Sequence, residues 1–270
     1  VVSSQDVQEL GTSIPAPATT AQPVVATVQP AAQAPQSSAT TNVSARFRVQ
    51  EMIARGGMAT VFMATEITTS ERVVWKQAHG QYNPLTVANQ KLVGEISLLQ
   101  MIRNPRIPQH IAHGKVFDEQ GNSCEVLIEE FIEGGDLKQM VIQVAKAGLS
   151  LPLGKVLDYV TAICEPLEHM ARLTEPVYHR DMIPHNMINH PIRGPVLSDF
   201  GLAKMIATGD DVSITRGGSG TWTPPERDSG ISGPFTDVWS LGKLLYFMLT
   251  NESPPAILSE SKVSEKFAES

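Results

Sequence analysis

A polar stretch two thirds of the way along the chain, Tyr178–Asn186, holds residue types that could do chemistry. It reads Tyr-His-Arg-Asp-Met-Ile-Pro-His-Asn. Pro184 and the density of polar residues disfavour a regular helix or strand, so we expect a loop. Loops held by a rigid scaffold are where catalytic groups often lie. Asp181 could take a proton from an alcohol, and Asn186 could help to hold a hard cation, although an ordinary polar loop would look the same.

A glycine-containing turn, Ala54–Val61, lies between two expected strands. Glycines allow a backbone to approach phosphate oxygens and to point N–H groups at them, although a plain hairpin turn is the alternative. Twenty residues after Gly56 stands Lys76, inside an apolar strand, where an ammonium is costly unless it is paired. Glu95, nineteen residues further on in an expected helix, is a candidate partner.

Three more stretches follow the polar loop. Asp199-Phe200-Gly201 comes after the apolar Pro195–Leu197, and an Asp at a strand end beside a glycine can reach a metal. Gly218–Glu226 and Asp237–Gly242 come next. Each stretch is a weak signal when it is taken alone.

The elements that must position these residues follow from apolar periodicity and from turn residues. Strands and one helix come first, and helices dominate afterwards, which predicts an α+β fold with a smaller, strand-rich lobe and a larger helical lobe. Asp136 is a plausible N-cap for one of the helices. The expected strands are Phe47–Arg55, Ala59–Glu66, Arg72–Ala78, Ile111–Phe117 and Cys124–Phe131, and the expected helices are Leu85–Ile102, Asp136–Lys146, Leu153–Leu173 and Thr236–Thr250.

Composition limits the class of protein. The chain has 270 residues, of which 41% are hydrophobic, and this suits one or two globular domains. No apolar run approaches the ~20 residues of a membrane span, and no signal peptide is expected at Val1–Leu10. The net charge of −7 argues against non-specific nucleic-acid binding. Two cysteines make neither a disulfide framework nor a zinc site, which favours a cytoplasmic location.

Residues 1–45 differ from the rest of the chain. They are rich in Ala, Pro, Thr, Gln and Ser, with only two charged residues up to residue 44. Such a segment buries too little apolar surface to offset its chain entropy, so we expect a disordered linker. A proline-rich ligand for another domain is the weaker alternative.

Taken together and in order, the motifs resemble those of the eukaryotic-like protein kinase superfamily, and most of all its bacterial serine/threonine branch. That family has a glycine loop, a strand lysine, a helix glutamate, His-Arg-Asp with Asn five residues later, Asp-Phe-Gly, and Ala-Pro-Glu. The resemblance covers roughly residues 46–255. It implies a bilobal fold, with a β-rich N-lobe and hinge at 46–132 and a mainly helical C-lobe at 133–270.

The resemblance implies ATP-dependent phosphoryl transfer, in which catalysis is positioning plus charge stabilisation. Lys76, oriented by Glu95, would hold the α- and β-phosphates of ATP. Asp181 would accept or orient the proton of the substrate hydroxyl. Asn186 and Asp199 would ligate Mg²⁺.

The resemblance also implies the rest of the nucleotide site. The glycine loop would cover the phosphates, apolar side chains would sandwich the adenine, and backbone groups of the inter-lobe hinge would meet its polar edge. These residues are, respectively, Ala54, Gly56 and Gly57; Val61, Val74 and Ile188; and Glu130 and Ile132. His179 and Phe200 are expected to pack in a core stack with Leu99, and Asp237 to tie the His-Arg-Asp loop to the Thr236–Thr250 helix.

The chain departs from the family pattern at several places. Ala54 and Ala59 stand where the family has its first and third loop glycines, which restricts φ. Glu129 takes the gatekeeper position at the back of the adenine pocket, where a buried carboxylate is expensive. Ile183 stands where serine/threonine kinases carry a lysine that helps to neutralise the transferring phosphate.

A further departure concerns the C-terminal end. The chain stops at Ser270, so the family's last helices are expected to be absent and the C-lobe incomplete. Those helices normally supply an arginine for the glutamate of Ala-Pro-Glu, which is Glu226 in this chain. We therefore expect an unpartnered acid and a less stable lower lobe.

These observations leave two main functions open, with a kinase for small molecules as a distant third. The leading expectation is a serine/threonine kinase that phosphorylates proteins, regulated through phosphate on Ser213 or Thr215 pairing with Arg180. An upstream kinase or a second copy of this chain would add that phosphate. The alternative is a pseudokinase or scaffold with little transferase activity.

Overall fold

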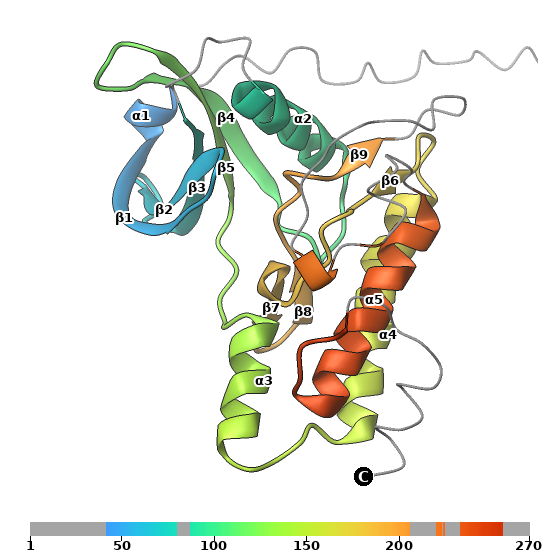
Figure 1. The fold of residues 1–270 in the computed structure, drawn as a ribbon. Coiled ribbons are helices and arrows are strands. Elements are labelled where there is room, and N and C mark those ends of the chain that lie inside the picture. Colours follow the sequence, from blue (N-terminus) through green and yellow to red (C-terminus); the bar gives the residue numbers. More distant parts are fainter. Residues whose placement is uncertain (1–41, 80–86, 206–219, 223, 225–232, 256–270) are drawn as a thin grey trace, which may run out of the picture. The chain divides into compact units, whose positions relative to one another are not determined.

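The computed structural model describes residues 42–79, 87–205, 220–222, 224 and 233–255. Five antiparallel strands form the sheet of the first lobe, in the order β1-β2-β3-β5-β4 (Figure 1). The first three strands have the predicted bounds, and the other two are displaced from prediction by one residue at one or both ends. The strands are β1 (Phe47–Arg55), β2 (Ala59–Glu66), β3 (Arg72–Ala78), β4 (His110–Phe117) and β5 (Ser123–Glu130).

The helix α2 (Val87–Met101) packs on this sheet. Its apolar residues Leu92, Ile96 and Leu99 are buried at helical spacing, as predicted. A polar anchor was not predicted: the buried Asn89 amide donates to the Ser123 carbonyl at 3.3 Å and accepts the Glu125 N–H at 3.1 Å. This pair of hydrogen bonds fixes α2 against β5.

The linker prediction was wrong at its end. Residues 1–41 lie outside the described residues, but a helical turn, α1 (Val43–Arg46), precedes β1. The Asn42 side chain caps it by accepting the Ala45 N–H at 3.2 Å. Val43 is fully buried in a cluster with Phe47 and Trp75. Burial of this apolar side chain against the sheet orders a turn that composition alone would leave disordered.

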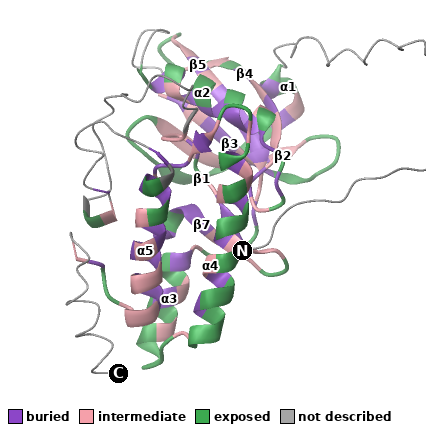
Figure 2. Cartoon of the chain, turned by 90° about the vertical axis from the view of Figure 1, so that its right-hand side faces the viewer, coloured by how far each residue is buried: buried purple, intermediate pink, exposed green. Residues whose placement is uncertain are grey.

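The second lobe is mainly helical. A continuous core joins α4 and α5, and buried residues line the inner faces of the lobe's helices (Figure 2). The predicted N-cap is confirmed, because the Asp136 carboxylate accepts the Gln139 N–H at 2.7 Å. None of the described helices is long and apolar enough to cross a membrane. The elements are α3 (Leu137–Lys146), α4 (Leu153–Ala171), β6 (Val177–Tyr178), the 3₁₀ turn η1 (Pro184–Asn186), β7 (Met187–His190), β8 (Gly194–Leu197), β9 (Lys204–Met205), the 3₁₀ turn η2 (Gly220–Trp222) and α5 (Pro234–Thr250).

Two arginines fasten the lobes together beside the hinge. Arg106, in the loop between α2 and β4, pairs with Glu165 of α4 at 2.8 Å, and its carbonyl accepts the Leu197 N–H at 2.8 Å. Arg193, in the β7–β8 turn, pairs with Glu130 at the end of β5, also at 2.8 Å. These ion pairs therefore connect the two lobes beside the hinge, in addition to the backbone that runs through it.

The hinge also needs a glycine. Gly134 has a φ of +131°, and a Cβ atom there would lie 2.3 Å from the Asn189 carbonyl oxygen. The carbonyl of the next residue, Gly135, accepts the Asn189 N–H at 2.8 Å. The chain after the hinge thus comes close enough to β7 to hydrogen-bond to it, which only a residue without a side chain permits.

Candidate functional site

A buried ammonium lies at the centre of the site. The Lys76 Nζ atom is 2.8 Å from Glu95 Oε1 and 2.7 Å from Asp199 Oδ1. Burial alone would lower the pKa of Lys76, but the Glu95, Asp199 and Glu129 carboxyls outweigh it and raise the pKa above its ordinary value. The predicted pairing of Lys76 with Glu95 is thus present, and Asp199 joins the same cluster from a distant part of the chain.

The carboxyls respond to this environment in opposite ways. Lys76 holds the pKa of Asp199 below its ordinary range. Burial raises the pKa of Glu95 despite its lysine partner. At Glu129, burial and the neighbouring Glu95 carboxylate raise the pKa to about 8. Glu129 is therefore mostly protonated at neutral pH, which resolves how an acid can occupy this position.

Two side chains hold the backbone of the polar loop in place: the Asn186 amide and the Asp237 carboxylate. The Asn186 side-chain nitrogen donates to the backbone carbonyl of Asp181 at 2.8 Å and to its Oδ2 atom at 3.1 Å. The amide oxygen of Asn186 is therefore the atom left to accept a cation. Asp237 of α5 accepts the N–H groups of His179 and Arg180 at 2.8 and 2.7 Å, as predicted.

Two residues of the site have left-handed backbone conformations. Arg180 has a φ of 66° and Asp199 a φ of 61°, conformations that are uncommon for residues other than glycine. Packing holds both segments: the ring of His179 meets that of Phe200 edge-on, with centroids 4.8 Å apart. His179 thus packs, as expected. Strained backbone beside such a cluster is typical of functional sites.

The turn between β1 and β2 tolerates its alanines. The Gly56 N–H donates to the Ala59 carbonyl at 2.9 Å, which closes the turn. Ala54 and Ala59 both have negative φ, so the expected restriction causes no backbone strain.

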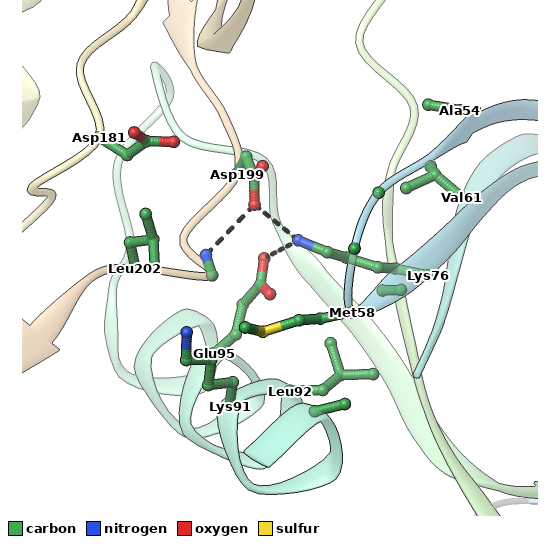
Figure 3. A pocket seen from close by; sticks show the side chains of 15 residues that line it. Ala54, Met58, Val61, Lys76, Lys91, Leu92, Glu95, Asp181, Asp199 and Leu202 are labelled. Atoms are coloured by element: carbon green, nitrogen blue, oxygen red, sulfur yellow. Dashed lines mark hydrogen bonds and ion pairs between the residues drawn. The ribbon is translucent and has the colours of Figure 1, made fainter. Parts of the chain in front are cut away.

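These residues surround a cavity of roughly 340 Å³ (Figure 3). In Figure 3 the Lys76 ammonium points between the Glu95 and Asp199 carboxylates, and Asp181 lies across the view from Val61. Glu95 and Asp181 come from elements that are 86 residues apart in the sequence. The predicted site residues that line the cavity are Ala54, Gly56, Gly57, Val61, Lys76, Glu95, Asp181 and Asp199.

Within the described part of the chain, the other predicted residues do not line this cavity. Asn186 lies directly behind Asp181. Val74 is opposite Glu129 in the β3–β5 register, and Ile188 forms a bridge with Asp136. The remaining two, Glu130 and Ile132, lie at the end of β5 and just after it. The predicted phosphorylation sites Ser213 and Thr215, and Glu226, lie outside the described residues.

Several residues that line the cavity were not predicted from the sequence. They include Met58 at the tip of the turn, Leu202 after Asp-Phe-Gly, and the α2 residues Ala88, Lys91 and Leu92. The helical spacing of Lys91 and Leu92 from Glu95, four and three residues, was a usable signal. Nothing in the sequence marked Met58 or Leu202.

The donor set suits a hard cation bound together with phosphates. Asp199 Oδ1 already accepts from Lys76 and from the Gly201 N–H, so Oδ2 is the oxygen left for a metal. Among the described residues, no group of three or more His, Cys, Asp and Glu side chains could hold a metal ion alone. Mg²⁺ is commonly bound by one or two protein groups, waters and substrate phosphates.

Comparisons with known proteins agree with this geometry. The family profile described as protein kinase domain matches residues 47–269. The chain is 29% identical to human serine/threonine-protein kinase Nek2 over 73% of its own length and 44% of that protein's. It is 26% identical to the carbon catabolite-derepressing protein kinase of Candida albicans, over 77% of this chain and 32% of that one. It is also 26% identical to the SNF1-like protein kinase ssp2 of Schizosaccharomyces pombe, over 76% of this chain and 34% of that one.

The chain therefore spans less than half the length of these relatives. The family match, in contrast, covers most of the chain and includes every residue that lines the cavity. The small antiparallel sheet with one helix, followed by helical elements, is the bilobal architecture of that family. By sequence and by fold, this chain belongs to the protein kinase domain family.

Proposed function

We propose that the protein transfers the γ-phosphate of ATP to serine or threonine hydroxyls of other proteins. One observation carries the proposal: Lys76 is held between Glu95 and Asp199, and all three line one cavity with Asp181. A fixed ammonium, a carboxylate for a metal and a carboxylate for a hydroxyl are the parts that phosphoryl transfer needs.

Each residue has a distinct part in the proposal. Lys76 binds the α- and β-phosphates and is oriented by Glu95. Asp181 accepts or orients the substrate proton. Asp199 and Asn186 supply oxygens to Mg²⁺, which neutralises phosphate charge when it is bound.

The adenine site is proposed at the hinge, between Val61, Val74 and Ile188. The Glu130 N–H already donates to the Gln109 carbonyl at 2.9 Å, so the Glu130 carbonyl is the group offered to the base. The backbone of Ile132 supplies the second contact. This assigns residues 46–132 to the N-lobe and hinge, and 133–270 to the C-lobe.

The finer points of the proposal rest on sequence. Human Nek2 and the two fungal relatives all carry protein-kinase names, and all three are eukaryotic, so the likeness to bacterial kinases remains a prediction. Ser219 stands where serine/threonine kinases have a threonine near the catalytic Asp, which favours that substrate class over tyrosine. A cytoplasmic location and phosphorylation at Ser213 or Thr215 are also proposed.

A pseudokinase or scaffold is the second candidate. Ile183 is the specific observation that favours it, because no cation stands where the family's lysine would meet the transferring phosphate. Ala54 and Ala59 favour it less, since neither strains the backbone. Glu129 would still alter the pocket that receives the adenine.

The deciding experiment is phosphate transfer from labelled ATP with Mg²⁺. We expect incorporation into dephosphorylated casein, or into the chain itself, that Asp181→Asn reduces by about a hundredfold or more. Circular dichroism of both proteins shows that the comparison is between folded samples. Equal incorporation by the two folded proteins, at background level, would leave the scaffold function as the better account.

A further inference from the structure

A lysine is buried in the middle of α5. Lys243 is 0% exposed, and it lies on a helix whose buried residues include the apolar Leu244 and Met248. An ammonium in such a place is expensive unless it is paired, and burial lowers the pKa of Lys243. Such a residue calls for a specific partner.

Two partners of Lys243 are backbone carbonyls. Its Nζ atom donates to the Thr221 carbonyl at 2.8 Å and to the Pro255 carbonyl. It also lies 4.2 Å from the centroid of the Trp239 ring, within range of a cation–π contact. Hydrogen bonds from a charged donor are roughly twice as strong as neutral ones.

The segment that Lys243 holds is Gly220–Trp222, the turn η2. Its second attachment is Trp222, whose ring meets Phe247 of α5 edge-on at 5.6 Å. Thr221 itself is exposed, so the backbone of the turn is fixed while its outer side faces solvent. Two residues after this turn comes Pro224-Pro225-Glu226, the segment that the family resemblance implies as the floor that receives a protein substrate.

The same helix fixes the catalytic loop. Asp237, six residues before Lys243, holds the N–H groups of His179 and Arg180. Six residues of helix span about 9 Å along its axis. One rigid element therefore carries both attachments: Asp237 sets the position of Asp181, and Lys243 sets the position of η2.

We propose that Lys243 is a positioning residue for protein substrates, which holds η2 at a fixed distance from Asp181. This rests on the proposed function. A hydroxyl can reach Asp181 productively only if the backbone of its chain lies at a set distance, and small displacements cost rate steeply. Lys243 thereby acts on the protein substrate and leaves nucleotide binding unchanged.

The test compares the full chain with Lys243→Met, which keeps side-chain length and apolar stem while removing the donor. We expect the KM for casein to rise about tenfold or more, since two charge-assisted hydrogen bonds are lost. The KM for ATP should stay within about twofold, because no atom of the nucleotide cavity changes. Lys155→Met, which removes an exposed lysine of α4, is the matched control and should leave both KM values unchanged.

Hydrogen exchange followed by mass spectrometry gives a readout that needs no catalysis. In Lys243→Met we expect faster exchange over residues 220–222 and unchanged exchange at His179 and Arg180, which Asp237 still holds. Lys243→Arg keeps a charged donor and should restore slow exchange and most of the casein affinity. Lys243→Gln, which keeps a shorter neutral donor, replaces the methionine variant if that variant does not fold.

Three results would overturn the proposal. They are an unchanged KM for casein in Lys243→Met, an equal rise in both KM values, or wild-type exchange over residues 220–222. A wild-type chain that transfers no phosphate contradicts the proposed function and the substrate role together. Slow exchange at η2 in that inactive chain, lost in Lys243→Met, would still show that Lys243 holds the segment, so the two failures are distinguishable.

Discussion

At the scale of single residues, the site has one lysine for three carboxyls. Lys76 is surrounded by Glu95, Asp199 and Glu129, all of which contribute to its raised pKa. Three ionised carboxylates around one ammonium would leave two uncompensated charges in a largely buried place. Protonation of Glu129 removes one of them, and a divalent cation at Asp199 would compensate the other.

The Glu129 proton makes stability depend on pH. Its folded-state pKa of about 8 lies above its ordinary value of 4.5, so the folded state retains a proton that the unfolded state releases between these two pH values. The contribution of Glu129 to the free energy of unfolding is therefore full below pH 4.5 and is lost as the pH rises through about 8. The slope is at most about 1.4 kcal/mol per pH unit.

Glu129→Gln replaces the titrating carboxyl group with a neutral amide of similar size and polarity. We expect the variant to melt several degrees above wild type at about pH 9 and close to it at about pH 5, with the difference growing between them. Thermal denaturation across that range measures it. Glu133→Gln, an exposed acid just past the hinge, is the control. A constant difference at every pH would contradict the account.

Ile183 offers a gain-of-function test. It is half-buried in the same loop as Asp181, where the family's lysine would meet the transferring phosphate. We expect Ile183→Lys to raise kcat by about tenfold, since a preorganised charge at a transferring group is worth this much or more. Ile183→Met, of similar size but uncharged, should leave kcat unchanged in steady-state kinetics. Equal rates for the lysine and methionine variants would show that the missing cation does not limit transfer.

At the scale of elements, the lobes are joined by hydrogen bonds that contribute unequally to the free energy of unfolding. Arg106 pairs with Glu165, whose side chain is 54% exposed, and such a surface pair is worth about 0–1 kcal/mol. The same guanidinium also donates to the Arg193 carbonyl and, at 3.4 Å, to the Pro195 carbonyl. Loss of a charged donor to these partly buried carbonyls costs more, about 1–3 kcal/mol.

This difference predicts the outcome of a double-mutant cycle. Arg106→Met should lower the free energy of unfolding by about 1–3 kcal/mol and Glu165→Gln by less than about 1 kcal/mol. The coupling energy between them should also stay below about 1 kcal/mol, because the carbonyls dominate. Urea denaturation of the four proteins measures all three values. A coupling as large as the whole effect of Arg106→Met would instead make the ion pair the main fastening.

At the scale of the whole molecule, local pattern predicted the elements and motif order predicted the cluster. The strands β1, β2 and β3 had the predicted bounds because turn residues separate them from one another. The contact of Lys76 with Glu95 was predictable from spacing once the family was identified. The contacts that were not predicted form between distant parts of the chain. They are the burial of Val43 on the sheet, the hydrogen bonds of Asn89 to β5, and the pairing of Lys243 with η2. No local pattern encodes such contacts.

The cluster around Lys76 predicts how nucleotide stabilises the folded chain. A ligand that binds only the folded state at about a hundred times its Kd adds about 2.7 kcal/mol, which raises the melting temperature of a domain this size by roughly 5–10 °C. We expect such a shift with saturating ATP and Mg²⁺. Lys76→Met should abolish it because the phosphates lose their ammonium, whereas Asp199→Asn should abolish only the part that depends on Mg²⁺. A shift equally large in all three proteins would place the nucleotide outside the cavity that Lys76, Glu95 and Asp199 share.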